Sequence, residues 1–135
     1  MPHAETQTRS VVVERVLAHS PDKVWRALTQ PHLISEWLMK NDFAPAVDHR
    51  FKLTAGWGEI DCRVVALEPP NRLSYTWEAM GLESVVTWTL TSSGAGTHLR
   101  MEQAGFRPDQ KQALMGATAG WTKFFDRLEA VAGRA

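Results

Sequence analysis

The sequence predicts an α+β fold in which a curved six-stranded antiparallel sheet and two short helices wrap around a long C-terminal helix. Through residues 48–106, apolar side chains recur at every second position, which is the period of half-buried strands. Short turns containing glycine or proline separate these runs, so consecutive strands pair antiparallel and share one apolar face. The last segment, from about residue 108 to 132, repeats instead at the three-to-four spacing of a helix.

The predicted domain begins with one strand and two short helices. Residues 11–18 are rich in β-branched side chains, which are typical of a strand. Ser20 followed by Pro21 indicates a helix start, with a capping hydroxyl and a proline at the first helical position. Because Pro31 opens a second helix directly after the first, we expect helices over residues 21–29 and 31–38.

The remaining strands follow one another without an intervening helix. We expect them near residues 51–54, 60–67, 73–78, 86–90 and 99–103. In the second of these, Ile60 and Cys62 share one parity while Val65 and Leu67 share the other, and a bulge would reconcile the two. If the second parity faces inward, Arg63 becomes a candidate anion anchor in a pocket; if the first does, Arg63 faces solvent.

The C-terminal helix is expected to leave space against the sheet. About 25 residues give it a length of about 37 Å, enough to lie across the whole sheet, but a helix is only about 10 Å wide. Its first half carries small residues such as Ala113, Gly116 and Gly120, whereas large side chains begin at Trp121. Two interpretations stay open: the glycines allow close packing of helix and sheet, or they leave the volume of a pocket at one end.

Composition sets limits on domain number, location and partners. The 135 residues suit one domain over residues 10–133, preceded by a flexible arm over residues 1–9. With 15 basic and 15 acidic residues, the chain lacks the charge excess that nonspecific nucleic-acid or membrane-surface binding needs. No apolar run approaches the length of a membrane span. A single cysteine, Cys62, and no visible signal peptide predict a cytoplasmic protein, either a monomer or a homodimer.

Four spaced motifs carry a resemblance to a known family. They are Ser20-Pro21-x-x-Val24-Trp25-x-Ala27-Leu28-Thr29-x-Pro31 with Trp37, then Pro69-Pro70-x-Arg72-Leu73-x-Tyr75-x-Trp77, then Gly105-Phe106, and finally Gly120-Trp121-x-x-x-Phe125-x-x-Leu128. Over residues 11–130 the chain resembles START-like, or SRPBCC, domains, and more closely the family named for the activator of the heat-shock-protein-90 ATPase. The resemblance implies a helix-grip, birch-pollen-allergen-like fold with a deep cavity for lipids, polyketides, plant hormones or other apolar molecules. Residues 46–50 depart from the family pattern, so the cavity mouth is expected to differ.

The sequence contains no recognisable catalytic or metal motif. The five histidines form no metal-binding spacing, and neither a nucleophile elbow nor a phosphate-binding or dinucleotide-binding glycine loop occurs. Cys62 lies in a strand without a neighbouring base and is expected to be a small buried hydrophobe. We therefore predict no cofactor, no metal and no catalytic residue, and the sequence favours a binding protein over an enzyme.

A ligand site is predicted from strand parity and the small residues of the helix. Gln103 shares the inward parity and is either a satisfied core amide or the group that fixes the polar end of a ligand. Trp25 and Trp37 are expected to seal the short helices, while Trp57 guards the mouth or covers an edge. The predicted wall is Phe51, Tyr75, Trp77, Val86, Trp88, Leu99, Met101, Gln103, Ala117 and Trp121.

Three functions are compatible with these features. The first is binding of a small, largely apolar or aromatic molecule in a cavity between the sheet and the C-terminal helix. The second is a chaperone cofactor-like interaction module, for which Trp57 and Phe43 are the candidate surface patch. The third is an enzyme, a cyclase or hydrolase acting on a polyketide-like or lipid-like substrate, with Gln103 or Arg63 as the residues to test.

Overall fold

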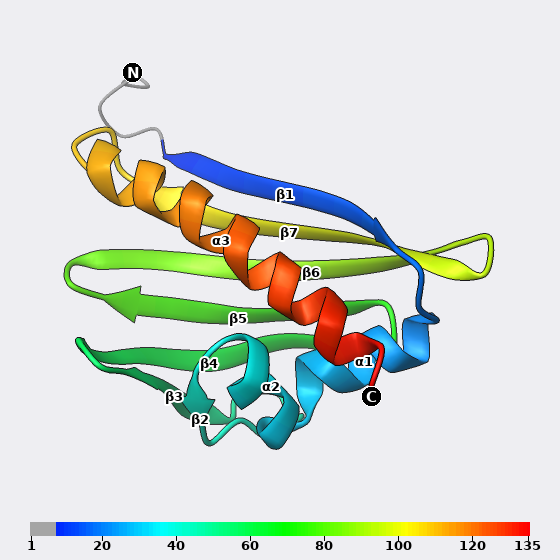
Figure 1. The fold of residues 1–135 in the computed structure, drawn as a ribbon. Helices are drawn as coiled ribbons and strands as arrows, with labels where there is room; N and C mark the ends of the chain where they lie inside the picture. The colour runs from blue at the N-terminus through cyan, green and yellow to red at the C-terminus, as the bar shows by residue number, and fades with distance from the viewer. Residues whose placement is uncertain (1–7) are drawn as a thin grey trace.

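The computed structural model describes residues 8–135 and follows the predicted order of elements (Figure 1). The elements are β1 (Arg9–Leu17), α1 (Pro21–Thr29), α2 (Pro31–Trp37), β2 (Lys40–Asn41), β3 (Arg50–Ala55), β4 (Gly58–Glu68), β5 (Arg72–Ala79), β6 (Leu82–Ser93), β7 (Gly96–Phe106) and α3 (Lys111–Ala132). Residues 1–7 of the predicted arm lie outside the described residues. Because β1 already includes Arg9, the strand takes in the last position of that predicted arm.

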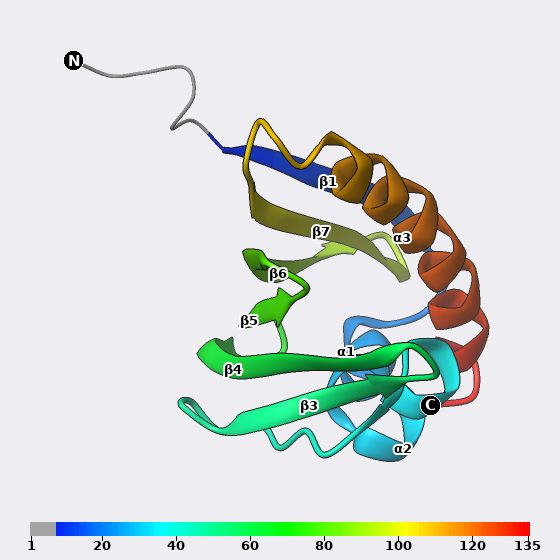
Figure 2. The same ribbon diagram turned by 90° about the vertical axis from the view of Figure 1, so that its left-hand side faces the viewer.

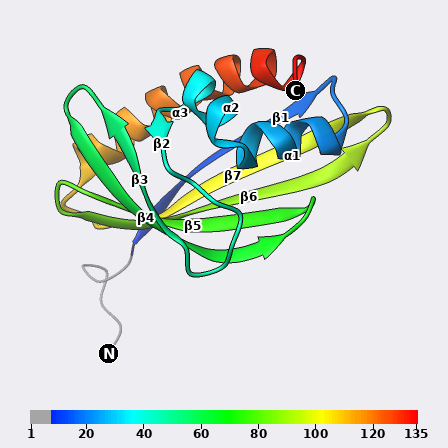
Figure 3. The same cartoon turned by 90° about the horizontal axis from the view of Figure 1, so that it is seen from below.

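All strands belong to one antiparallel sheet in the order β1-β7-β6-β5-β4-β3-β2. The sheet has seven strands, so the predicted number of six was wrong. The additional strand is β2, whose two residues pair with Thr54 and Leu53 of β3 and are too few to show any alternation. Figures 2 and 3 show the sheet bending around α3, which crosses its concave side.

A bulge in β4 resolves the ambiguous register of that strand. Val64 lies opposite Tyr75 while Ala66 lies opposite Ser74, so one extra residue is accommodated between the two pairs. The first parity therefore faces inward, and Arg63 points to the other side, where its Nη1 donates to Asp48 Oδ1 at 2.8 Å. Arg63 is a surface residue, and the alternative of an anion anchor in the pocket is excluded.

The two short helices close one end of the concave face. Ser20 caps α1 by accepting a hydrogen bond from the backbone N–H of Lys23 at 3.4 Å, and Pro21 occupies the first turn. The indole of Trp37 is buried and donates to the Ala27 carbonyl at 2.7 Å, which fixes α2 on α1. The half-buried Trp25 packs against the same core. Figure 1 shows both helices beside the C-terminal end of α3.

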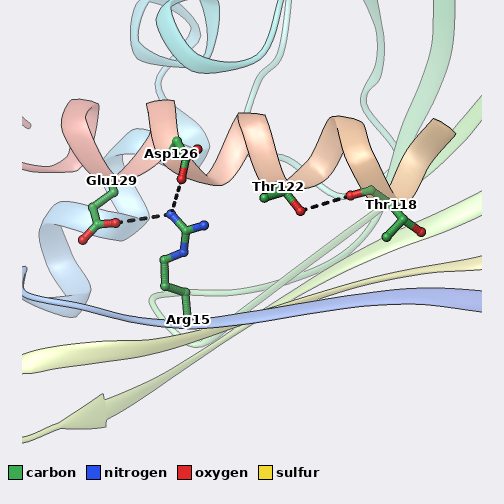
Figure 4. A network of polar contacts seen from close by, with 5 residues as sticks. All are labelled: Arg15, Thr118, Thr122, Asp126 and Glu129. Carbon is green, nitrogen blue, oxygen red and sulfur yellow. Dashed lines mark hydrogen bonds and ion pairs between the residues drawn. The ribbon is translucent and has the colours of Figure 1, made fainter. Parts of the chain in front are cut away.

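The C-terminal half of α3 is tied to β1 by one arginine. Arg15 Nη1 donates to Asp126 at 2.8 Å and approaches Glu129 at 3.4 Å (Figure 4). The same guanidinium lies 5.6 Å from the ring centroid of Phe125. Such partly exposed ion pairs contribute about 1 kcal/mol or less, so the buried apolar residues of this half, including Leu128, hold the helix in place.

The helix α3 begins three residues later than the proline at position 108 suggested. Pro108 and Asp109 form a turn, and Lys111 is the first helical residue. The side chain of Gln110 stabilises this turn because its Oε1 accepts the backbone N–H of Arg107 at 2.9 Å. The predicted C-terminal end at Ala132 is confirmed.

Candidate ligand-binding site

A pocket of about 540 Å³ opens between the N-terminal half of α3 and the sheet. Residues of the β3–β4 and β5–β6 turns line it. Figure 1 shows these two turns at the end of the sheet away from α1. Three sets of side chains surround it: a face of small residues on α3, a group of aromatic residues beneath, and a rim of turn residues. Its volume falls within the range of about 300–1,000 Å³ that small-molecule sites occupy.

The helix wall of the pocket, here called the small-residue face, consists of Ala113, Gly116, Ala117 and Gly120. Their spacing places them on one side of α3. A Cβ atom added at Gly116 or at Gly120 would meet no heavy atom within 4 Å, and neither residue has a positive φ. Close packing therefore does not explain these glycines, and the second interpretation, that they leave the volume of a pocket, is the one the structure supports.

Aromatic side chains form the floor of the pocket. The ring centroids of Trp77 and Trp121 lie 5.3 Å apart, and Phe124 lies 5.4 Å from Trp121. Trp121 also packs edge-on against Trp88 at 5.6 Å, which connects the floor to the filled core. Because the residues Trp77 and Trp121 are only 9% and 2% exposed, packing within the protein holds the floor in place.

A chain of buried hydrogen bonds fixes the orientation of this floor. Trp121 Nε1 donates to Gln103 Oε1 at 2.7 Å, and Gln103 Nε2 donates to Ser84 Oγ at 3.0 Å. Ser84 in turn donates to the carbonyl of Trp77 at 2.9 Å. Both ends of the Gln103 amide are thus paired within the protein, as the interpretation of a satisfied core amide requires. Gln103 positions Trp121, and its amide nitrogen retains one further N–H.

A second polar pair lies in the filled core, away from the pocket. Trp88 Nε1 donates to the hydroxyl oxygen of Tyr75 at 3.0 Å. Burial raises the pKa of Tyr75 well above its usual value, so the phenol is neutral at physiological pH. The ring of Tyr75 packs on Phe51 at 5.4 Å, and Phe51 packs on Phe43 at 5.1 Å. Tyr75 therefore serves packing, and it is not available to orient a ligand in this pocket.

The structure divides the ten residues of the predicted wall into two groups. Four line the pocket: Trp77, Gln103, Ala117 and Trp121. Six are buried in the filled interior and do not line it: Phe51, Tyr75, Val86, Trp88, Leu99 and Met101. Strand parity identified the concave face correctly but could not tell which part of that face α3 covers with large side chains. Sequence reasoning missed lining residues at the strand ends, among them Ala79, Leu82 and Phe106.

Two exposed apolar residues stand at the mouth. Trp57, in the β3–β4 turn, is 58% exposed and lines the pocket, so its predicted role at the mouth fits better than cover of an edge. Met80, in the β5–β6 turn, is 90% exposed and adopts a φ of 51°, followed by Gly81 at 83°. Phe43 is buried against Phe51, so the expected surface patch of Trp57 and Phe43 does not form.

The polar part of the rim comes from the β7–α3 turn and the first turn of α3. Arg107 Nη1 and Gln110 Nε2 both donate to the Gly81 carbonyl at 3.2 Å, which holds the β5–β6 turn against the start of the helix. The carboxylate of Asp109 accepts from Arg107 Nε at 3.2 Å. Lys111 also lines the pocket, and it forms no ion pair within residues 8–135.

The part of the chain that the structure describes offers no metal site. Within it, no group of three or more His, Cys, Asp or Glu side chains is arranged to hold a metal ion. Cys62 is buried, and burial together with the carboxylates of Asp61, Glu78 and Asp42 raises the pKa of its thiol. A thiol kept protonated is a poor nucleophile. No helix within residues 8–135 is long and apolar enough to span a membrane.

This fold and this pocket define the class of protein. It is a helix-grip domain with an apolar pocket beneath the N-terminal half of its long helix. The family model described as "Activator of Hsp90 ATPase homolog 1-like protein" matches residues 18–133. The chain belongs to that family, within the START/SRPBCC superfamily, as the sequence motifs predicted. None of the curated proteins matches the chain.

Solved structures with the same fold are numerous. Protein MLL2253 of Mesorhizobium loti is 59% identical, with a TM-score of 0.91 over 94% of this chain and 98% of that one. CalU16 of Micromonospora echinospora is 27% identical, with a TM-score of 0.81 over 93% of this chain and 76% of that one. DynU16, from the dynemicin biosynthetic locus, is 27% identical, with a TM-score of 0.80 over 90% of this chain and 46% of that one.

Proposed function

We propose that the protein binds a small, largely apolar or aromatic molecule in the pocket beneath the N-terminal half of α3. The small-residue face carries this proposal. A glycine inside a helix costs about 1 kcal/mol relative to alanine, and neither close contact nor backbone conformation requires Gly116 or Gly120. The two glycines have one evident structural consequence, which is an open space in front of a fixed aromatic floor.

The chemistry of the wall supports an apolar ligand. Trp77, Trp121, Phe106 and Phe124 contribute aromatic rings to the lining, and the small-residue face contributes only backbone and methyl groups. Affinity at such a site comes from removing apolar surface from water, about 25 cal/mol per Å². The few polar groups lie at the floor and rim, where they orient a ligand.

The test is a titration with N-phenyl-1-naphthylamine, a neutral probe that fluoresces when it enters an apolar site. The wild-type protein is expected to bind it, and Gly116→Leu, which fills the pocket, is expected to lose binding. Ala119→Leu is the matched control because Ala119 is exposed on the same helix and does not line the pocket. Absence of binding to the wild type, or equal binding by both variants, would contradict the proposal.

Catalysis on a polyketide-like or lipid-like substrate is the alternative use of the same pocket. Its support is the similarity to DynU16, a protein from a biosynthetic locus. Of the two residues first considered, only Gln103 lines the pocket, so turnover would depend on Gln103 and not on Arg63. Steady-state turnover of a candidate substrate by Gln103→Ala and by Arg63→Ala tests this dependence: turnover should be lost in the first variant and kept in the second.

The chaperone role rests on the family description alone. The surface patch expected for it does not form, because Phe43 is buried. Stimulation of a chaperone ATPase by the purified protein would support this role, and lack of stimulation and of pull-down would end it. A cytoplasmic location and a monomeric or homodimeric state stay predictions.

A further inference from the structure

The pocket has an uneven distribution of charge. Among its lining residues only Asp109 and Lys111 carry full charges, and both lie at the mouth. Asp109 is paired with Arg107 Nε at 3.2 Å. The charges of Arg107 and Asp109 therefore offset each other. The remaining positive charge at the mouth is that of Lys111, which has no ion-pair partner within residues 8–135.

The rest of the pocket lining is largely apolar. The small-residue face has no side chain longer than a methyl group, the indole of Trp121 follows it on the same helix, and Trp77 of β5 lines the pocket from the sheet. Aromatic rings prefer offset or edge-on contacts with other rings, at centroid distances of about 4.5–7 Å. A planar ring system suits this space because it can lie along the small-residue face and make offset or edge-on contacts with the indoles of Trp77 and Trp121.

We propose that the ligand is an aromatic acid: its ring lies between the small-residue face and Trp77, and its anionic group pairs with the ammonium of Lys111 at the mouth. This inference rests on the proposed function and adds the charge and orientation of the ligand. Lys111 then selects anionic over neutral aromatic molecules of the same shape. Lys111 contacts the anionic group of the ligand, and Trp57 and Met80, which are also at the mouth, cover its apolar part.

Two fluorescent probes of nearly the same shape separate the proposals. 8-Anilino-1-naphthalenesulfonate carries a sulfonate, and N-phenyl-1-naphthylamine is the same ring system without it. We expect the wild type to bind the sulfonate more tightly. Lys111→Met keeps the length of the side chain and removes the charge, so it should weaken sulfonate binding about threefold to fivefold, near the upper end for a partly exposed ion pair.

The controls test position and charge in turn. Lys123→Met removes an exposed lysine from the same helix outside the pocket and should leave both affinities unchanged. Lys111→Arg keeps the charge and should retain the preference for the sulfonate. Raising the salt concentration should weaken binding of the sulfonate, because a partly exposed ion pair is screened, and leave that of the neutral probe nearly constant.

The outcomes distinguish the two claims. If neither probe binds, the proposed function itself fails. If both probes bind but Lys111→Met leaves the ratio of their affinities unchanged, the apolar pocket stands and the role of Lys111 is wrong. If Lys123→Met lowers sulfonate binding as much as Lys111→Met does, the effect is a general one of net charge, and the assignment to Lys111 is likewise overturned.

Discussion

Replacing Gly116 and Gly120 together by alanine should make the protein more stable and weaken its ligand binding. Each added Cβ meets no heavy atom within 4 Å, so no steric cost offsets the gain. Each glycine-to-alanine change in a helix contributes about 1 kcal/mol, and the double variant therefore up to about 2 kcal/mol. For a domain of this size that corresponds to a rise in Tm of about 4–8 °C.

Urea denaturation followed by circular dichroism measures the free energy of unfolding of the wild type and the variant. Gly105→Ala is the contrasting control, because Gly105 has a φ of 124° and its added Cβ would lie 2.5 Å from the Glu83 carbonyl oxygen. That variant should lose stability. If Gly116→Ala and Gly120→Ala also lost stability, the glycines would be needed for packing, and the reasoning that assigns them to an open pocket would be refuted.

Two further predictions concern the buried polar groups. Gln103→Met should lower the free energy of unfolding by about 1–3 kcal/mol, because the indole N–H of Trp121 loses its acceptor. As a control in the same urea titration, Gln112→Met at the exposed rim should change the free energy of unfolding by less than about 0.5 kcal/mol. Tyr75, the single tyrosine, has a raised pKa in the folded state, so stability holds below pH 10 and falls as the pH rises above it. Its absorbance at alkaline pH should change only together with loss of the near-ultraviolet circular dichroism, and ionisation before unfolding would contradict its burial.

The sequence was sufficient for most of the architecture because local signals were strong. Ser20 and Pro21 marked the start of α1, and the alternation around Tyr75 and Trp77 defined the inward face of β5. The bulge in β4 was visible as a change of parity, and the structure confirms it after Val64. Strand β2 was missed because a two-residue strand has no periodicity to detect.

The site was harder to predict because a cavity depends on two elements at once. Parity places Trp88 and Trp77 on the same face of the sheet, but only Trp77 lines the pocket. The difference arises on α3, whose side chains change from glycine and alanine to large aromatic residues at Trp121. Which strand residues face each half of the helix follows from the angle at which α3 crosses the sheet, and no local pattern encodes that angle.

The location of a bound ligand is the sharpest test of a pocket beneath the N-terminal half of α3. Nuclear magnetic resonance spectra of the ¹⁵N-labelled protein, recorded while N-phenyl-1-naphthylamine is added, report on each backbone amide and on each of the six indole N–H groups. We expect shifts at the amides of Gly116 and Gly120 and at the indole of Trp57, with the indole of Trp37 unchanged. Shifts confined to the convex face of the sheet, or none at Gly116 and Gly120, would contradict it.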